Sequence, residues 1–269
     1  MKYFCVGFIL LVMANSSYAQ NAKLCHIAGM GFYATDGKQG VLMDALFSDG
    51  MDGDPIASQE LNVALEGANG EFKDVSLIFA SHIHEDHMKA KPILRHMKAN
   101  KKTSVILPEQ ARLLMLAAGV ASSDGRIIYS SLKPGEIQKL NDQPFPVTLF
   151  GLSHGEGSQV DNIGIQVTVG GKTIMQVGDM YGIQNGLGEQ KKISVDYLIL
   201  PFWYFNEPER VDYINSVFDV EYIIPAHFSL NTSEWMLAQG GIDAVKKRDF
   251  STTSNLVQLD QEMMCVNLD

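Results

Sequence analysis

The stretch Ser81–His87, "SHIHEDH", places three histidines and two carboxylates within seven residues. It directly follows the apolar run "VSLIFA", residues 75–80, which is typical of a buried strand. The whole chain has only seven histidines, so this stretch holds three of them. A polar loop after a buried strand is the simplest interpretation. A metal site is the alternative, and it requires further ligands elsewhere in the chain.

Strand-like and helix-like segments alternate along the whole chain. Asp36-Gly37 and Gly170-Gly171 are typical hairpin turns, and no Pro/Ser/Gly-rich linker divides the sequence. We expect one α/β domain in which helices cover the sheets. The strands are expected within residues 24–47, 75–80, 103–108, 125–130, 145–153, 163–179, 195–200 and 220–226. The helices are expected within residues 92–100, 109–119 and 208–218.

Three more side chains that can bind a metal follow apolar strands. "VTLFGLS" leads to His154, "TIMQVGD" ends on Asp179, and "VEYIIPA" leads to His227. Ligands at strand ends are held by a rigid backbone and can converge at one edge of a sheet. Five of the seven histidines belong to this pattern, which random polar loops do not explain.

The spacing within the histidine stretch divides the ligands into two sets. Residues two apart in an extended segment point the same way, so His82 and His84 can hold one ion. The chain must then turn, which directs Asp86 and His87 to a second ion. Asp179 has two oxygens and can bridge a pair of ions roughly 3.5–4 Å apart. The first set is His82, His84 and His154, and the second is Asp86, His87 and His227. Imidazole and carboxylate ligands suit zinc, and also manganese or iron.

The "HIHEDH" segment resembles the H-x-H-x-D-H signature of the metallo-β-lactamase superfamily. The resemblance continues in the family's order through His154 in "LSHGEG", Asp179 in "VGDMY" and His227 in "IPAHF", and covers residues 24–230. It implies a four-layered αβ/βα sandwich with a dinuclear site at the sheet edges. Within the superfamily the chain most resembles the lactonase and phospholipase-D-like branch, and this resemblance is weaker than that to the superfamily as a whole. Met180 departs from the small residue usual after the bridging aspartate, which leaves the subfamily open.

Three residues outside the two ligand sets also have an expected role. The resemblance implies that Asp44, in "VLMDALF", supports the metal loop, and we expect a buried hydrogen-bonding residue there rather than a ligand. His26 lies in an apolar strand and is expected in the core. His96 is expected on a helix surface.

Aromatic residues near the last ligands are candidate substrate contacts. Trp203 and Tyr204 lie in "PFWYF", which follows a strand, and Tyr181 lies two residues after Asp179. A packing cluster is the alternative interpretation of the "PFWYF" segment.

The expected chemistry is hydrolysis by a metal-bound hydroxide, because two metals lower the pKa of a shared water from 15.7 to about 7. Asp86 is the expected catalytic residue, since it can orient the nucleophile and pass a proton to the leaving group. A small-molecule ester, lactone or phosphodiester is the expected substrate. The alternatives are a β-lactamase-type amide hydrolase and a metal-binding or ligand-binding module without turnover. Asp179 argues against a lactamase, because lactamases of the family usually lack a bridging carboxylate at this position.

The N-terminus is typical of a cleaved secretory signal. Lys2 precedes the apolar run "YFCVGFILLVMA", and Ser17 and Ala19 are the small residues expected before a cleavage after Ala19. We therefore expect a signal peptide at residues 1–19, one domain at residues 20–269, and a secreted or periplasmic protein. The alternative is a retained N-terminal anchor. No other stretch is apolar enough to suggest a stable membrane insertion.

The net charge indicates which partners the protein can bind, and the cysteine content raises the question of a disulfide. The net charge is −10, and removing residues 1–19 makes it −11 because Lys2 is their only charged residue. An acidic protein would repel the phosphates of nucleic acid. The sequence has no basic run, only pairs such as Lys101-Lys102 and Lys246-Lys247. Nucleic acid is therefore not an expected partner. Cys25 and Cys265 remain after cleavage and form either a disulfide or two separate thiols. The oligomeric state is open.

Overall fold

A computed structural model of the chain describes residues 22–48, 55–183, 186–187, 192–228, 234–238, 240–247, 252 and 254–268. The expected signal peptide, residues 1–19, lies outside these ranges. Within them no helix is both long enough and apolar enough to span a membrane.

The first half of the chain forms one sheet, which the C-terminal strand completes. β2 and β3 form the expected hairpin around Asp36-Gly37, and β3 to β6 run parallel to one another. The spatial order is β14 (Cys265–Asn267), β1 (Lys23–Ala28), β2 (Gly31–Thr35), β3 (Gly40–Met43), β4 (Val75–Phe79), β5 (Ser104–Pro108) and β6 (Ile127–Ser130).

The second half forms the other sheet. β9 and β10 are the hairpin turned at Gly170-Gly171, and β10 to β13 run parallel. The spatial order is β13 (Asn255–Leu256), β12 (Phe218–Ala226), β11 (Ile193–Pro201), β10 (Lys172–Gln176), β9 (Asn162–Val169), β8 (Val147–Leu152) and β7 (Ile137–Leu140).

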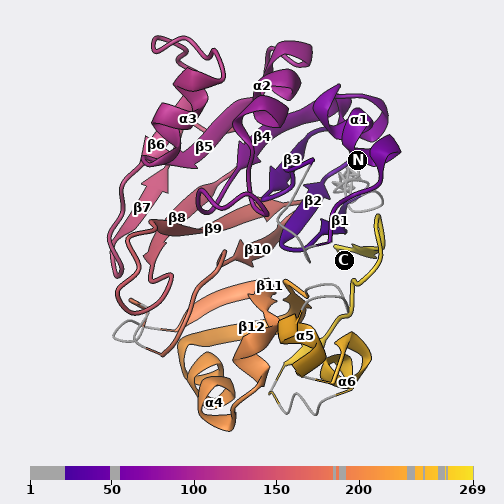
Figure 1. Ribbon diagram of the computed structural model, residues 1–269, viewed down its shortest axis with the longest axis vertical. Coiled ribbons are helices and arrows are strands. Elements are labelled where there is room, and N and C mark those ends of the chain that lie inside the picture. Colours follow the sequence, from indigo (N-terminus) through magenta and orange to yellow (C-terminus); the bar gives the residue numbers. More distant parts are fainter. Residues whose placement is uncertain are drawn as a thin grey trace, which may run out of the picture.

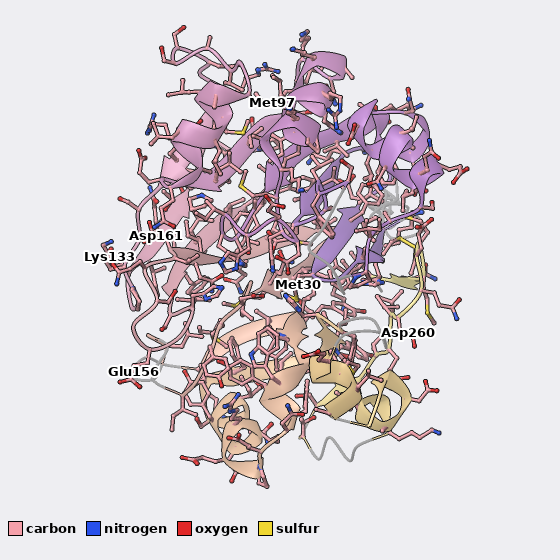
Figure 2. The ribbon with its side chains drawn as sticks, viewed as in Figure 1. Met30, Met97, Lys133, Glu156, Asp161 and Asp260 are labelled. Carbon is pink, nitrogen blue, oxygen red and sulfur yellow. A yellow bond between two sulfur atoms is a disulfide. The ribbon has the colours of Figure 1, made fainter. Side chains whose placement is uncertain are left out.

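Three large apolar cores hold the sheets and most of the helices together, and a small fourth cluster contains Phe202, Met236 and Val245. Phe32 and Phe79 of the first sheet meet Ile165 and Ile199 of the second in a shared core. Met30, at the centre of Figure 2, is buried in this core. A second core packs the first sheet against α1 (Gln59–Glu66), α2 (Ala90–Ala99) and α3 (Ala111–Ala117).

The third core packs the second sheet against α4 (Pro208–Val217) and the 3₁₀ turn Phe202–Phe205. α5 (Glu234–Ala238) and α6 (Ile242–Lys246) lie in the same half of the molecule as α4 (Figure 1). Helices thus cover the outer side of each sheet, which confirms the αβ/βα sandwich expected from the sequence.

The two ends of the described chain meet at β1 and β14. Cys25 and Cys265 are directly opposed in this antiparallel pair and are joined by a disulfide. The disulfide closes a sequence separation of 240 residues, so it ties the C-terminal strand to the edge of the first sheet. Of the two alternatives left open by the sequence, a disulfide or two separate thiols, the structure has the disulfide.

The two remaining histidines differ from expectation. His96 is fully buried, and its Nδ1 atom lies 2.5 Å from the carbonyl oxygen of Leu65. The expectation of a surface residue is wrong because His96 shares the inward face of α2 with Ile93 and Met97. His26 is only partly buried, and its ring packs on Phe32.

Candidate metal centre

Every predicted ligand lies just after the carboxyl end of a strand, at one edge of the sandwich. The histidine stretch follows β4, His154 follows β8, Asp179 follows β10, and His227 follows β12. The structure brings all seven predicted ligands together as two neighbouring groups of potential ligand atoms. The first group is His82, His84, His154 and Asp179, and the second is Asp86, His87 and His227.

The first group presents three imidazole nitrogens around a common point. His82 Nε2 and His84 Nδ1 are 3.0 Å apart. Asp179 Oδ2 lies 3.7 Å from His82 Nε2 and 3.7 Å from His154 Nε2. Ligands of one zinc ion each lie about 2.0–2.2 Å from the metal, so donor atoms separated by 3–4 Å match a shared ion.

The second group has the same spacing. His87 Nε2 and His227 Nε2 are 3.2 Å apart, and Asp86 Oδ2 lies 3.5 Å and 3.3 Å from them respectively. The other carboxylate oxygen of Asp179, Oδ1, lies 3.1 Å from His87 Nε2 and 3.2 Å from His227 Nε2. Asp179 therefore directs one oxygen to each group, as a bridging carboxylate does.

Unsatisfied polar atoms support the assignment of this cluster to metal ions. Asp86 Oδ1 and His154 Nε2 are buried without a hydrogen-bond partner. Leaving such atoms unpaired costs about 1–3 kcal/mol each, and more for charged groups. Divalent cations at the two groups would satisfy them, so the residues present fit a pair of metal ions.

The charges of the cluster are strongly coupled in the absence of metal. Burial acts to raise the pKa of Asp179, but His227 and His87 outweigh it and hold that pKa well below its usual value. Burial acts to lower the pKa of His227, but Asp179 and Asp86 raise it to about 10. The pKa of His82 is held well below its usual value by burial and by repulsion from His87.

A buried carboxylate behind the histidines sets their orientation. Asp44 Oδ2 lies 2.8 Å from His87 Nδ1, and the two oxygens of Asp44 also accept hydrogen bonds from the backbone N–H and the hydroxyl of Ser81. The Ser81 hydroxyl donates to Asp44 and lies 3.0 Å from His82 Nδ1, so it can accept from that nitrogen. Both histidines then carry their protons on Nδ1 and keep the Nε2 lone pair for a metal. The expected supporting role of Asp44 matches this geometry.

The backbone around the site is held in uncommon conformations. Asp44 and His227 have φ values of +45° and +65°, a region that residues other than glycine rarely adopt. The His227 N–H donates to the carbonyl of Gly29, which fixes this turn. Gly178 has a φ of +54°, and a side chain there would meet Asn162 Oδ1 and the Ser81 side chain.

Asn162 and Ser81 are functional residues that the sequence analysis did not identify. Asn162 Oδ1 accepts a hydrogen bond from the Asp179 N–H, and its amide donates to the Val177 carbonyl. The amide thereby fixes the loop that carries Asp179. An asparagine at the start of a strand gives no sequence signal for this role, whereas Ser81 directly precedes the histidines.

The three predicted substrate contacts are placed differently. The Trp203 ring lies 5.0 Å from the His227 ring, and its indole N–H donates to the Met180 carbonyl. Tyr181 is 47% exposed, and the Arg210 guanidinium lies 4.8 Å from its ring centroid. Tyr204 is fully buried and its hydroxyl donates to the Gly182 carbonyl, so its assignment as a substrate contact is wrong. It is a core residue because the 3₁₀ turn directs its ring inward.

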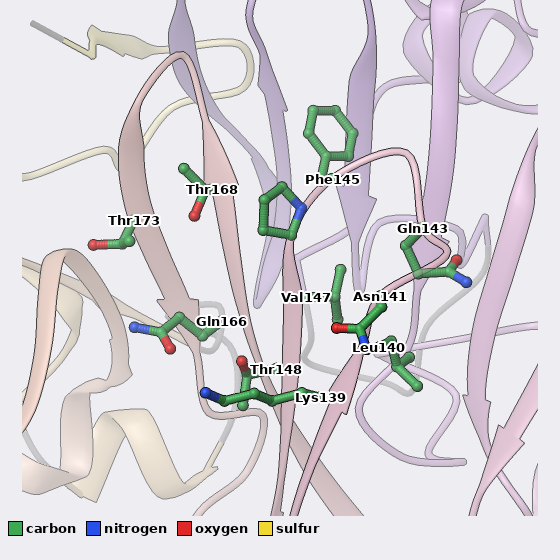
Figure 3. A pocket seen from close by; sticks show the side chains of 11 residues that line it. Lys139, Leu140, Asn141, Gln143, Phe145, Val147, Thr148, Gln166, Thr168 and Thr173 are labelled. Carbon is green, nitrogen blue, oxygen red and sulfur yellow. The ribbon is translucent and has the colours of Figure 1, made fainter.

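A separate polar hollow of about 420 Å³ lies over β7, β8, β9 and β10 (Figure 3). Its walls include Lys139, Gln166 and Thr173. None of the predicted ligands lines it, so it is distinct from the metal centre.

Sequence and structure comparisons agree with this geometry. Residues 39–241 match the family model described as "Beta-lactamase superfamily domain". No curated protein matches the sequence significantly.

Several solved structures share the fold over nearly their whole length. A metallo hydrolase from Ignicoccus hospitalis matches with a TM-score of 0.57 and 16% identity, over 92% of this chain and 99% of that one. A possible metal-dependent hydrolase from Veillonella parvula gives a TM-score of 0.57 and 13% identity, over 91% and 99% of the two chains.

The short form of human tRNase Z gives a TM-score of 0.55 and 14% identity, with coverage of 92% and 99%. At these identities the likeness is one of fold, whereas the family match spans most of the sequence. The chain belongs to the β-lactamase superfamily and is a metal-dependent hydrolase with the metallo-β-lactamase fold.

Proposed function

We propose that this protein is a secreted hydrolase that binds two divalent metal ions and cleaves an ester, lactone or phosphodiester bond in a small-molecule substrate. The observation that supports it best is the placement of Asp179, whose two oxygens face the two ligand groups at 3.1–3.7 Å. The mixed histidine and carboxylate donors suit zinc, with manganese or iron as alternatives.

Two bound ions would supply a water with a pKa near 7 and would polarise a carbonyl or phosphoryl oxygen. The chain's own residues have separate tasks. Asp44 and Ser81 orient His87 and His82, and Asn162 orients the loop of Asp179.

Asp86 is the proposed proton carrier. Burial acts to raise its pKa, but the hydrogen bond and charge of His227, with the charge of His87, lower it below the usual value. The side chain is therefore an ionised carboxylate near neutral pH. Its Oδ2 faces His227, and an ionised carboxylate at this place can accept a proton from water and return it to the leaving group.

Trp203 and Tyr181 are the proposed substrate contacts. Trp203 packs on His227 at the edge of the second ligand group, and Tyr181 extends into solvent two residues after Asp179. Aromatic rings at these places would contact the apolar part of a substrate and position its scissile bond.

Secretion is supported by two features. Residues 1–19 have the pattern of a signal peptide, and the Cys25–Cys265 disulfide is in keeping with an oxidising compartment. N-terminal mass spectrometry on protein from the native host is expected to find a chain that begins at Gln20. Soluble protein that retains Met1 would contradict secretion.

The reaction class is tested with a panel of esters, lactones, phosphodiesters and β-lactams. We expect turnover of at least one of the first three classes by zinc-loaded or manganese-loaded protein, and its loss on chelation. Turnover confined to β-lactams would favour the lactamase alternative. A fully metal-loaded protein that hydrolyses nothing in the panel would favour a binding module.

A further inference from the structure

The segment from Lys89 to Lys102 is strongly basic in an otherwise acidic chain. It holds six of the 21 lysines and arginines and no aspartate or glutamate. It comprises α2 with its flanking residues, directly after the metal loop. The cations are spread over 14 residues, so they do not form a consecutive run.

Most of this positive charge faces solvent. Lys89 pairs with Glu85 at 3.0 Å, and Arg95 pairs with Glu66. Four exposed lysines have no carboxylate within 4 Å among the described residues, namely Lys91, Lys98, Lys101 and Lys102.

An apolar surface lies beside this basic helix. α3 packs against α2, and both lie at the top of Figure 1. α3 buries only Ala111 and Met115. Leu113, Leu114 and Leu116 are 75%, 44% and 39% exposed. Single exposed leucines are ordinary, and these three together expose more apolar side chain than is usual on one short helix.

A groove of about 720 Å³ lies between the first part of the basic segment and one of the exposed leucines, Leu114. Lys91 and Arg95 line it from α2, and Leu114 lines it from α3. It extends to Ile83 and Glu85 of the metal loop. Met97, labelled in Figure 2, lies buried on the inward side of α2, so the opposite side of this helix carries the cations.

We propose that the α2–α3 face, the segment Lys89–Lys102 together with Leu113, Leu114 and Leu116, docks the protein on an anionic lipid surface. The lysines would contact acidic headgroups while the leucines enter the acyl boundary, as at other interfacial helices. The chain rests on the bilayer in this arrangement and does not span it. Docking would also bring the metal loop close to the lipid surface.

Charge and surface chemistry favour an anionic lipid surface over a second copy of the chain and over nucleic acid. A symmetric contact with a second copy would oppose the same basic faces, which repel each other. Nucleic acid would also be attracted by the lysines, but it offers no apolar medium for three leucines.

The test measures partitioning of the full chain, and of the chain beginning at Gln20, onto vesicles by co-sedimentation. Vesicles of phosphatidylcholine alone are compared with vesicles that contain 30% phosphatidylglycerol. We expect binding to the anionic vesicles that weakens as salt increases.

Two sets of variants separate charge from apolar contact. Each lysine near an anionic bilayer raises partitioning roughly fivefold, so Lys98→Gln, Lys101→Gln and Lys102→Gln together should reduce binding about 100-fold. Leu113→Gln with Leu116→Gln should reduce it about tenfold or more. The matched control is Lys73→Gln, Lys133→Gln and Lys139→Gln, which changes charge equally elsewhere and should not reduce it comparably. Thermal melts check that each variant folds.

Several results would overturn the proposal. These are no binding to anionic vesicles, equal binding to both vesicle types, or an equal loss in the control variant. Binding to a single-stranded RNA with no vesicle binding would identify a nucleic-acid surface instead. Concentration-dependent dimers that the leucine variant abolishes, without vesicle binding, would assign the face to a second copy.

Discussion

Asp44 Oδ2 lies 2.8 Å from His87 Nδ1, while the Nε2 atom of the same ring lies 3.2 Å from His227 Nε2. The carboxylate thus holds the proton on the side of the ring that faces away from the ligand group. A neutral His87 then presents a lone pair to a metal. The orientation of the second ligand group therefore depends on a residue that binds no metal itself.

Asp44→Asn should weaken metal binding without unfolding the protein. The Asn amide nitrogen accepts no hydrogen bond. In either orientation it would face a donor, which is the Ser81 N–H in one and the Ser81 hydroxyl with His87 Nδ1–H in the other. We expect the apparent affinity for zinc to fall about 10–100-fold, measured by competition with a chelator. The exposed Asp142→Asn is the control and should leave the affinity unchanged. Equal affinity in both variants would show that Asp44 has only a packing role.

Asp86→Asn and Asp179→Asn should separate catalysis from metal retention. Asn at position 86 keeps the size of the side chain but cannot carry a proton between water and leaving group. We expect turnover to fall about 10²–10⁴-fold while most of the metal is retained. Asp179→Asn removes the charged bridge and should lower metal content itself. Metal content and turnover are measured together. A parallel loss of both in Asp86→Asn would show that Asp86 only binds metal and has no separate role in proton transfer.

Metal binding should release protons at neutral pH. Burial acts to lower the pKa of His87, but Asp179 and Asp44 raise it well above its usual value, and the pKa of His227 is about 10. His227 is therefore protonated at pH 7 in the metal-free protein, and both rings must present an unprotonated Nε2 to bind metal.

Because protons compete with the metal for these histidines, the metal affinity should rise with pH as long as they are protonated. We expect apparent zinc affinity to increase at least tenfold per pH unit between pH 6 and 8. Calorimetry in two buffers with different ionisation enthalpies would measure the released protons directly. A pH-independent affinity with no proton release would show that the histidines are already neutral.

Removing the disulfide should destabilise the fold without altering the site. Cys25 and Cys265 close a sequence separation of 240 residues, so the bond restricts the unfolded chain strongly. Cys25→Ala with Cys265→Ala should lower the free energy of unfolding by about 2–4 kcal/mol in urea titrations. Peptide mapping after alkylation without reductant should recover the two cysteines as one cross-linked pair. Recovery of both as alkylated thiols would contradict the bond.

The sequence was sufficient to predict the architecture and the candidate ligands. His82 and His84 are two apart after a buried strand, and His154, Asp179 and His227 each follow another strand. This regularity holds because the carboxyl ends of β4, β8, β10 and β12 lie at one edge of the sandwich, so the order in the chain predicts the position of each ligand. The supporting role of Asp44 was predicted only from the resemblance to the family, in which an aspartate after an early strand supports the metal loop.

Other features depend on packing, which the sequence does not show. His96 was expected on the helix surface, but it shares a helix face with Ile93 and Met97. Tyr204 and Trp203 are adjacent in sequence, and only the 3₁₀ turn decides which of them faces the core. β7 was not predicted because the edge strand Ile137–Leu140 is exposed and lacks a continuous apolar run.

The measurement that tests the central claim most directly is the number and position of bound metal ions. Crystals of zinc-loaded protein, measured at wavelengths on both sides of the zinc absorption edge, would locate them by anomalous scattering. The structure predicts two zinc peaks per chain, one between His82, His84 and His154 and the other between Asp86, His87 and His227. Asp179 is predicted to contact both. A single ion, or no ion after loading with zinc or manganese, would contradict the dinuclear centre.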